Sequence, residues 1–383
     1  MSCDLIFVSA EPSGDDLSVA VIQSLRTKLP DIEIKAIGGD TLETVELSSP
    51  LDVSPLSVLG LFEGLKVYPQ VVKLADAAAE FIIDNAPKAV VLVDSWGFML
   101  RVAQRLKKRA PHIKLIKLVG PQVWATRPGR AKTLAKLVDH LLCIHDMEVP
   151  YYEPFGLPCT VIGNPALDRL EAGDGDAYRS QLGLDEDQRL LLILPGSRKS
   201  EISRTAPTLA EAARRLVERF GNRLKPVVLV SKSVAELVHS GNLSWPRDTH
   251  FEANVEAKAD LMSAADVALA CSGTVTTELA SQGCPMVVAY RMGPLTWFLA
   301  DKFLYQPDYA TLFNIAADKE VAPEFLQDQL TAENLSQAAG ALLTNDQERA
   351  KQIHEQFEAL ERMGLGGKPA PEIAAEALIE LLK

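Results

Sequence analysis

Short apolar runs alternate with segments of helical periodicity along the first part of the chain. The apolar runs lie at 5–10, 33–39, 89–93, 113–119, 141–145 and 159–163. Helical patterns lie at 15–29, 66–84, 98–109 and 129–137. Strands that alternate with helices in this way predict βαβ units and a mostly parallel sheet.

The same pattern starts again after a polar, glycine-containing stretch at 171–189. Its apolar runs lie at 190–195, 226–230, 249–253, 266–271 and 285–290, and residues 347–383 show helical spacing without a strand. A chain of 383 residues is too long for one ordinary core. We therefore expect an α/β protein of two doubly wound, Rossmann-like domains, 1–168 and 169–345, followed by C-terminal helices at 346–383 that pack back on a domain.

Composition narrows the class of protein. The formal net charge of −12 argues against a general nucleic-acid binder, which needs a basic face to neutralise phosphates. Five scattered cysteines without a CxxC pair argue against a disulfide framework or a zinc site. No basic segment precedes the N-terminal apolar run, and no uncharged run approaches the roughly 20 residues of a membrane span. We expect a cytoplasmic protein, at most peripheral on a membrane.

Two stretches of the first half place polar residues where a predicted strand ends. In SAEPSGDDL, Glu11, Ser13, Gly14 and Asp15 follow the first strand and open a helix. In VLVDSWGFM, Asp94 joins a strand to a helix. Ligands of open α/β sheets bind at the carboxyl ends of strands, so these residues are candidates for substrate contact. The alternative is that they only cap the helices.

The second half begins with a glycine turn that carries cations. In LPGSRKSEI, Gly196, Ser197 and Arg198 follow a strand. A guanidinium beside loop N–H groups suits a phosphate, because it offers paired donors. A salt bridge from Glu201 to Arg198 is the alternative, and it would make this cluster structural. The spacing fits neither a Walker A loop nor GxGxxG.

A further turn in the second half suits an anion. In ACSGTVTTELA, Ser272, Gly273 and Thr274 open a helix, and a helix N-terminus favours negative charge. Glu278, one turn later, can reach ribose hydroxyls. The two turns together predict a nucleotide diphosphate in the second domain, facing the first domain across a cleft. The DGD sequence at 174–176 lies in a polar linker without a preceding strand, so we expect no metal site.

These stretches together resemble the lipid A disaccharide synthase family. The matching segments, from residue 5 to about 330, are SAEPSGDDL, AIGGDTLE, GPQVWATRPGRAKTLAKLVDHLLCI, VIGNP, LPGSRKSEI, ACSGTVTTELASQGCPMVVAYRMGPLTWFLA and DYATLFNIAADKEVAPEFLQ. The resemblance implies the GT-B fold and an inverting glycosyltransferase without a cofactor. Its implied reaction moves diacylglucosamine from UDP to diacylglucosamine 1-phosphate (lipid X) and forms a β-1,6 disaccharide. It also implies attachment to the cytoplasmic face of the inner membrane and homodimers swapped through their C-termini.

The resemblance also assigns residues to the donor. Arg198 matches the family's arginine in LPGSR, and Asn314 matches an asparagine in a later loop. Asp15 matches the aspartate of the N-terminal SGD. The implied UDP contacts are Gly196, Ser197, Arg198, Ser272, Gly273, Thr274, Glu278, Tyr290, Arg291 and Asn314.

Two positions depart from the family's pattern. The family typically reads IDAPDFN, and its second aspartate is implicated in catalysis. Here the residues are VDSWGFM, so that Asp94 keeps the first aspartate and Gly97 stands at the second. Asn164 stands where many members have His. An inverting transfer needs a base, and Gly97 cannot accept a proton. The candidate bases are Asp94, Asp15 and Glu11, and the candidate acceptor contacts are Ser13, Gly14, Trp96 and Asn164.

An apolar segment at 56–74 could face acyl chains and lipid. Its candidate contacts are Leu61, Phe62, Leu65, Val67 and Tyr68. A basic run at 105–109, with Arg127, Arg130 and Lys132, could meet anionic head groups. The alternative is a buried helix beside a solvated basic face.

Two other functions fit the same nucleotide turns. Another GT-B enzyme on UDP-sugars, an epimerase or a different transferase, would use them without needing the apolar 56–74 segment. A non-catalytic paralogue that binds UDP or lipid would explain Gly97.

Overall fold

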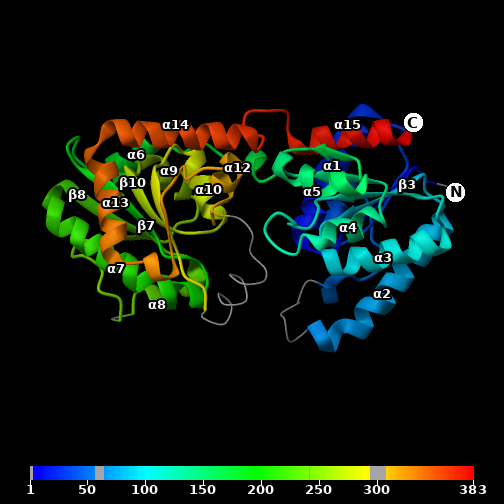
Figure 1. Ribbon diagram of the computed structural model, residues 1–383, viewed down its shortest axis with the longest axis horizontal. Coiled ribbons are helices and arrows are strands. Elements are labelled where there is room, and N and C mark those ends of the chain that lie inside the picture. Colours follow the sequence, from blue (N-terminus) through cyan, green and yellow to red (C-terminus); the bar gives the residue numbers. More distant parts are fainter. Residues whose placement is uncertain (1–2, 57–63, 241, 294–307) are drawn as a thin grey trace. The chain divides into compact units, whose positions relative to one another are not determined.

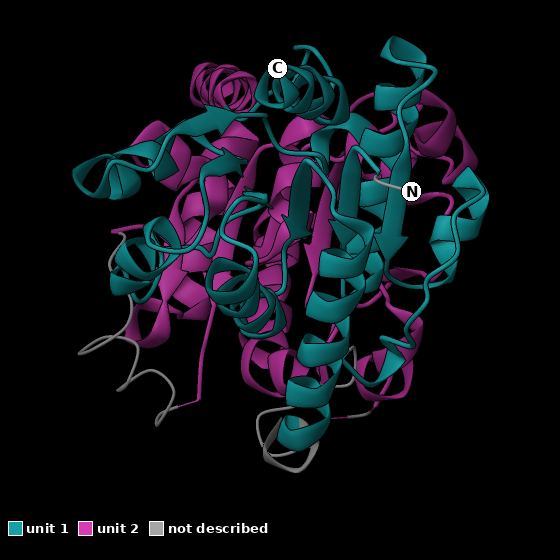
Figure 2. Cartoon of the chain, turned by 90° about the vertical axis from the view of Figure 1, so that its right-hand side faces the viewer, with its two compact units in different colours: residues 1–168, 363–383 teal, residues 169–362 magenta. Residues whose placement is uncertain are grey.

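The computed structural model describes residues 3–56, 64–240, 242–293 and 308–383, with the backbone alone for 64–67. The chain divides into two compact units (Figure 1, Figure 2). Unit 1 comprises residues 1–168 and 363–383, and unit 2 comprises residues 169–362. None of the helices in the described part of the chain is both long and apolar enough to span a bilayer.

Unit 1 is built on a six-stranded parallel sheet. Its strands are β1 (Leu5–Val8), β2 (Ile34–Ile37), β3 (Ala89–Val93), β4 (Lys114–Leu118), β5 (His140–Cys143) and β6 (Cys159–Val161), in the order β2-β1-β3-β4-β5-β6. Successive side chains of β1 alternate between two cores: Leu5 and Phe7 face one, whereas Ile6 and Val8 face the other. Both faces of the sheet are therefore covered, which explains the continuous apolar runs in the sequence.

Helices cover each face of this sheet. One core contains side chains of α1 (Pro12–Lys28) and the last helix α15 (Ala370–Leu382), which Figure 1 draws beside each other. The other contains α2 (Gly64–Asn85), α3 (Trp96–Arg109) and α4 (Gly129–Ala135). The short α5 (Val149–Tyr152) and the 3-10 helix η1 (Asp40–Val45) complete the main elements.

Unit 2 repeats the plan. Its strands are β7 (Arg189–Leu194), β8 (Leu224–Leu229), β9 (His250–Glu252), β10 (Val267–Cys271), β11 (Met286–Tyr290) and β12 (Glu324–Leu326), all parallel, in the order β12-β11-β10-β7-β8-β9. The α-helices in its described residues are α6 (Gly175–Gln181), α7 (Lys199–Phe220), α8 (Ala235–Val238), α9 (Lys258–Ala264), α10 (Thr274–Ser281), α12 (Leu312–Ala317), α13 (Ala332–Thr344) and α14 (Asp346–Arg362). The sequence pattern did not predict β12, which begins with Glu324 and is followed directly by the polar residues 327–329.

The strand order places the ligand side of each unit. In unit 1 the order reverses between β1 and β3, and in unit 2 between β7 and β10. Crevices at such reversals, outside the carboxyl ends of the strands, are where open α/β sheets bind ligands. The four polar stretches found in the sequence follow these four strands.

The C-terminal helices do not stay together. Helix α14 belongs to unit 2, whereas α15 belongs to unit 1, where Lys28 Nζ of α1 pairs with Glu376 at 3.0 Å. The returning chain passes Gly163 so closely that a Cβ on Gly364 would lie 3.1 Å from its Cα. Gly364 has φ +113°, a backbone conformation that favours glycine. We predicted 346–383 as one segment because the helical pattern continues through both helices.

Candidate functional site

Unit 2 has a pocket of about 600 Å³ at the β7–β10 reversal. It is lined by Leu194, Gly196, Ser197, Arg198, Glu201, Leu229, Val230, Ser231, Lys232, Ala253, Asn254, Val255, Lys258, Cys271, Ser272, Gly273, Thr274 and Val275. Both turns that the sequence proposed for a diphosphate therefore line one cavity. Its volume is within the usual range of small-molecule sites.

The turn after β7 is held by a carboxylate of its own. Glu201 Oε2 accepts hydrogen bonds from the backbone N–H of Ser197 at 3.0 Å and of Arg198 at 3.2 Å. Its Oε1 accepts from Arg198 Nη1 at 3.1 Å. Gly196, at φ +109°, is close enough that a Cβ there would lie 2.7 Å from Glu201 Oε2. The ion pair foreseen as the alternative is thus present, and these N–H groups are occupied.

Arg198 nevertheless remains available to a ligand. Its side chain is 79% exposed and borders the pocket. A surface ion pair of this kind contributes little stability, typically about 0–1 kcal/mol, so an incoming phosphate can replace it. The loop therefore offers a guanidinium and not a cradle of N–H groups.

The turn after β10 does present N–H groups. The Ser272 N–H is bound to the Ala289 carbonyl at 3.2 Å, and Thr276 donates to Gly273. Helix α10 begins at Thr274, so its first N–H groups lack intrahelical acceptors and lie at the pocket wall. Glu278 lies one turn further on, paired with Lys258.

Two cationic side chains at this pocket were not predicted from the sequence. Lys232 follows β8, and Lys258 is the first residue of α9. Both line the cavity, and Lys258 forms the ion pair with Glu278. The rule that ligand residues follow strand ends could have found Lys232, whereas Lys258 lies six residues after the end of β9.

Four of the residues implied for UDP lie outside the pocket lining: Glu278, Tyr290, Arg291 and Asn314. Tyr290, at the end of β11, has its pKa raised by burial, with Cys271 and Glu201 nearby. Arg291 Nη2 donates to two backbone carbonyls, those of residues 327 and 330, at 3.0 and 2.8 Å. These contacts hold the segment after β12.

Asn314 is completely buried. Its Nδ2 donates to the Ala322 carbonyl and to Glu324 Oε1, and its Oδ1 accepts from the N–H groups of Val321 and Ala322. All of its hydrogen-bonding positions are used inside the protein. In this structure Asn314 shapes a loop and has no group left for a ligand.

Unit 1 has a pocket of about 630 Å³ beside the carboxyl ends of β1 and β2. It is lined by Ala10, Glu11, Pro12, Asp15, Gly38, Gly39, Asp40, Thr41, Glu43, Leu47, Ser48, Ser49, Pro50, Leu51, Asp52, Val53 and Ser54. Carboxylates dominate its polar side chains. Carboxylates accept hydrogen bonds from hydroxyl groups, so the lining suits the hydroxyl groups of a sugar.

Asp15 is the most enclosed of these carboxylates, at 4% exposure. Ser9 Oγ donates to Asp15 Oδ1. The turn after β2 closes over it, because a Cβ on Gly38 or Gly39 would lie 2.5 Å from its oxygens. Gly14 is buried, and a Cβ there would make only ordinary contacts, 3.5 Å from Ser9. Ser13 is exposed and Glu11 is half-buried at the pocket rim.

Asp94 and Ser95 form a strained turn after β3. Their φ angles are +46° and +35°, in the left-handed region that non-glycine residues rarely adopt. Such strain gathers at functional sites, where the surrounding structure maintains it.

Trp96 begins α3, with the Arg130 guanidinium 5.1 Å from its ring centroid. Gly97 is exposed.

The other predicted contacts of unit 1 are spread out. Asn164 Oδ1 accepts from the Ala166 N–H at 3.0 Å and so shapes its own turn. Leu61 and Phe62 lie outside the described residues, as do the side chains of Leu65 and Val67. Tyr68 is 51% exposed, with the Arg101 guanidinium 5.0 Å from its ring centroid.

Comparison with known proteins decides the family. A family model described as lipid-A-disaccharide synthetase matches residues 5–377. Lipid-A-disaccharide synthases of Rhodospirillum centenum and Rickettsia bellii are 36% and 33% identical over 99% of this chain, which covers 94% and 99% of their lengths. The chain belongs to the lipid-A-disaccharide synthase family. It is therefore a glycosyltransferase of lipid A biosynthesis.

Solved structures place the synthase in the GT-B fold. The UDP-GlcNAc 2-epimerase of Neisseria meningitidis bound to UDP-GlcNAc has a TM-score of 0.61 at 14% identity, covering 99% of this chain and 100% of its own. MurG of Acinetobacter baumannii has a TM-score of 0.59 at 14% identity, covering 99% of both chains. At this identity the two structures show the fold alone. Membership in the synthase family decides against the epimerase and the other enzymes that the sequence left open.

Proposed function

We propose that this synthase transfers 2,3-diacylglucosamine from UDP to 2,3-diacylglucosamine 1-phosphate, with inversion, and forms a β-1,6-linked disaccharide. The observation that carries this assignment is the unit 2 pocket, where a guanidinium and a helix N-terminus line one cavity at a sheet reversal. Membership in the family indicates acylated sugars as the substrates and UDP as the carrier of the donor sugar.

UDP binds in the unit 2 pocket. Arg198 and the first N–H groups of α10 neutralise the diphosphate and stabilise the charge that develops on it as it departs. When UDP binds, Glu278 leaves its ion pair with Lys258 and accepts hydrogen bonds from the ribose hydroxyls. Lys258, released from that ion pair, adds its charge to those of Arg198 and Lys232 at the pocket.

Asp94 is the general base in this proposal. It follows β3 at the sheet reversal, in a strained turn, and it is half-buried without being enclosed. Asp15 is less suited to removing a proton from the acceptor, because it is enclosed by the 38–39 turn and bound by Ser9. Asp15 and Glu11 instead accept hydrogen bonds from the acceptor sugar in the unit 1 pocket.

The acyl chains require a membrane surface. The synthase works on the cytoplasmic face of the inner membrane as a peripheral protein, and the exposed Tyr68 with the neighbouring Arg101 supports contact there. Loss of vesicle co-sedimentation on Tyr68→Ser would support this attachment, and unchanged co-sedimentation would count against it. A homodimer swapped through the C-terminal helices is part of the same proposal.

The decisive experiment follows UDP release and disaccharide formation from purified UDP-diacylglucosamine and lipid acceptor. Asp94→Asn should lower kcat by about 100-fold or more, the usual contribution of a general base, with UDP affinity unchanged. Asp146→Asn is the matched control, because Asp146 also follows a strand of the same sheet, β5, and is exposed. Full turnover in Asp94→Asn would remove the base assignment. If the unaltered protein binds UDP but neither releases UDP from UDP-diacylglucosamine nor forms disaccharide, it is a non-catalytic binding paralogue.

A further inference from the structure

A lysine is buried beneath the Asp94 turn. Lys117, in β4, is 2% exposed. Its ammonium group donates to the backbone carbonyls of Leu92 at 3.2 Å, of Leu118 at 3.3 Å and of Asp94. All three acceptors are main-chain groups at the carboxyl ends of β3 and β4, so the side chain joins the two strands where they leave the sheet.

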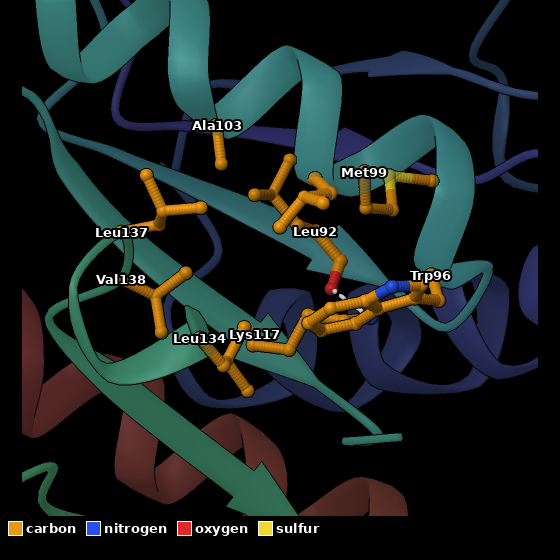
Figure 3. Close-up of a pocket in the computed structure, with 9 residues that line it drawn as sticks. Leu92, Trp96, Met99, Ala103, Lys117, Leu134, Leu137 and Val138 are labelled. Carbon is orange, nitrogen blue, oxygen red and sulfur yellow. Dashed lines mark hydrogen bonds between the residues drawn. The ribbon is translucent and has the colours of Figure 1, made fainter. Parts of the chain in front are cut away.

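The surroundings of this ammonium group are apolar. Lys117 lines a small cavity together with Trp96 (Figure 3). The other lining residues are Leu92, Met99, Leu100, Ala103, Leu134, Leu137 and Val138. Burial lowers the pKa of Lys117 to about 7, and the charge of Asp94 acts in the opposite direction. A charged group in such a place is costly unless hydrogen bonds satisfy it, and an apolar side chain would fill the space at less cost.

The backbone that Lys117 holds is strained on both strands. Asp94 and Ser95 have left-handed φ angles, and Val119, next to the Leu118 acceptor, has φ +64°. The Leu118 carbonyl also accepts from the Asp94 N–H at 2.9 Å, so Lys117 and Asp94 share this acceptor. A left-handed non-glycine residue is unfavourable by itself and persists only where neighbouring groups hold it. Lys117 supplies such a fixing contact from the adjacent strand.

We propose that Lys117 is a positioning residue for the transfer reaction: by binding the Asp94 carbonyl it holds the strained turn and aims the Asp94 carboxylate. This inference rests on the proposed role of Asp94 as the base. Without the hydrogen bond from Lys117, the turn relaxes toward ordinary φ angles and the Asp94 carboxylate moves away from the position in which it accepts the proton. A misplacement of about 1 Å at a reacting group costs on the order of 100-fold in rate.

The test compares Lys117→Met with Leu137→Ala. Leu137 lines the same cavity and holds no carbonyl of the turn, so its truncation reports the cost of a cavity alone. Lys117→Met should lower kcat by about 100-fold, with KM for both substrates within about twofold of the parent. Leu137→Ala should lower the melting temperature and leave kcat close to that of the parent. If Lys117→Met does not fold, Lys117→Gln, which keeps two donors without the charge, takes its place.

Asp94→Asn and the double variant separate the two proposals. If Lys117 acts through Asp94, adding Lys117→Met to Asp94→Asn causes no further loss of kcat, since coupled residues are not additive. If Asp94→Asn lowers kcat and Lys117→Met or Lys117→Gln does not, the positioning role is wrong and the base assignment stands. A loss that multiplies with that of Asp94→Asn, or equals that of Leu137→Ala, also overturns the positioning role. Full turnover in Asp94→Asn overturns both.

Discussion

Replacing Gly97 with Asp puts a carboxylate where the family resemblance implies the catalytic one. Gly97 is exposed in the first turn of α3, and its backbone lies outside the left-handed region. The nearest heavy atom to a Cβ built there would be Arg101 Nη1, at 3.9 Å. The site therefore has room for an aspartate without a shift of the backbone.

The effect on stability is small and favourable. A carboxylate in the first turn of a helix gains about 0.3–1 kcal/mol from the macrodipole. A pair with Arg101, four residues on, adds about 0.2–0.5 kcal/mol. Removing the backbone freedom of a glycine adds a few tenths more, roughly, for a total of about 1 kcal/mol. For a unit of this size that raises the melting temperature by about 2–4 °C.

The effect on turnover depends on which carboxylate works. If Asp94 is already the base, Gly97→Asp alone should leave kcat within about threefold of the parent. In the Asp94→Asn background it should recover at least about tenfold, because general base catalysis is worth about 100- to 10,000-fold. Gly97→Asn is the control, with the same size and no proton-accepting charge. The assay is UDP release with both lipid substrates.

Either of two results would refute the role of Asp94 and of a carboxylate at position 97. A rise of 100-fold or more from Gly97→Asp alone would show that position 97 is where a base belongs and that Asp94 does not serve as one in the unaltered chain. If Gly97→Asn also restores kcat in the Asp94→Asn background, the recovery comes from the changed start of α3 and not from the charge of a carboxylate.

Three further predictions concern the donor pocket and the response to pH. Arg198→Met should weaken UDP binding by about 10- to 150-fold in calorimetry, the contribution of a charge-assisted hydrogen bond, whereas Arg214→Met, in the helix that follows Arg198, should leave it unchanged. Glu278→Gln should weaken UDP binding by about tenfold or more and leave UMP and UDP equally affected, because its role is at the ribose; a loss confined to UDP would contradict it. Between about pH 7 and 10.5 the unfolded chain keeps a proton that folded Lys117 has released, so this residue makes the free energy of unfolding rise with pH. Denaturant titrations at pH 7 and 9.5 should show that rise shrinking in Lys117→Met.

Much of the fold could be predicted from local pattern. Most strands are buried and read as apolar runs. Eleven of the described strands were predicted, whereas β12, which begins with Glu324 and is followed by polar residues, was not. The polar stretches around Asp94, Arg198 and Ser272 could also be predicted as ligand turns, because each directly follows a strand of a parallel sheet.

The sequence by itself determined the two α/β units and the strand ends at which chemistry is placed, because both depend on short-range periodicity. Only the tertiary structure decided which groups meet there. It placed Lys258 against Glu278, and it closed the 38–39 turn over Asp15. It also brought Lys117, 23 residues away in sequence, under the Asp94 carbonyl. Such contacts depend on how strands and loops pack side by side, and no periodicity along the chain encodes that distance.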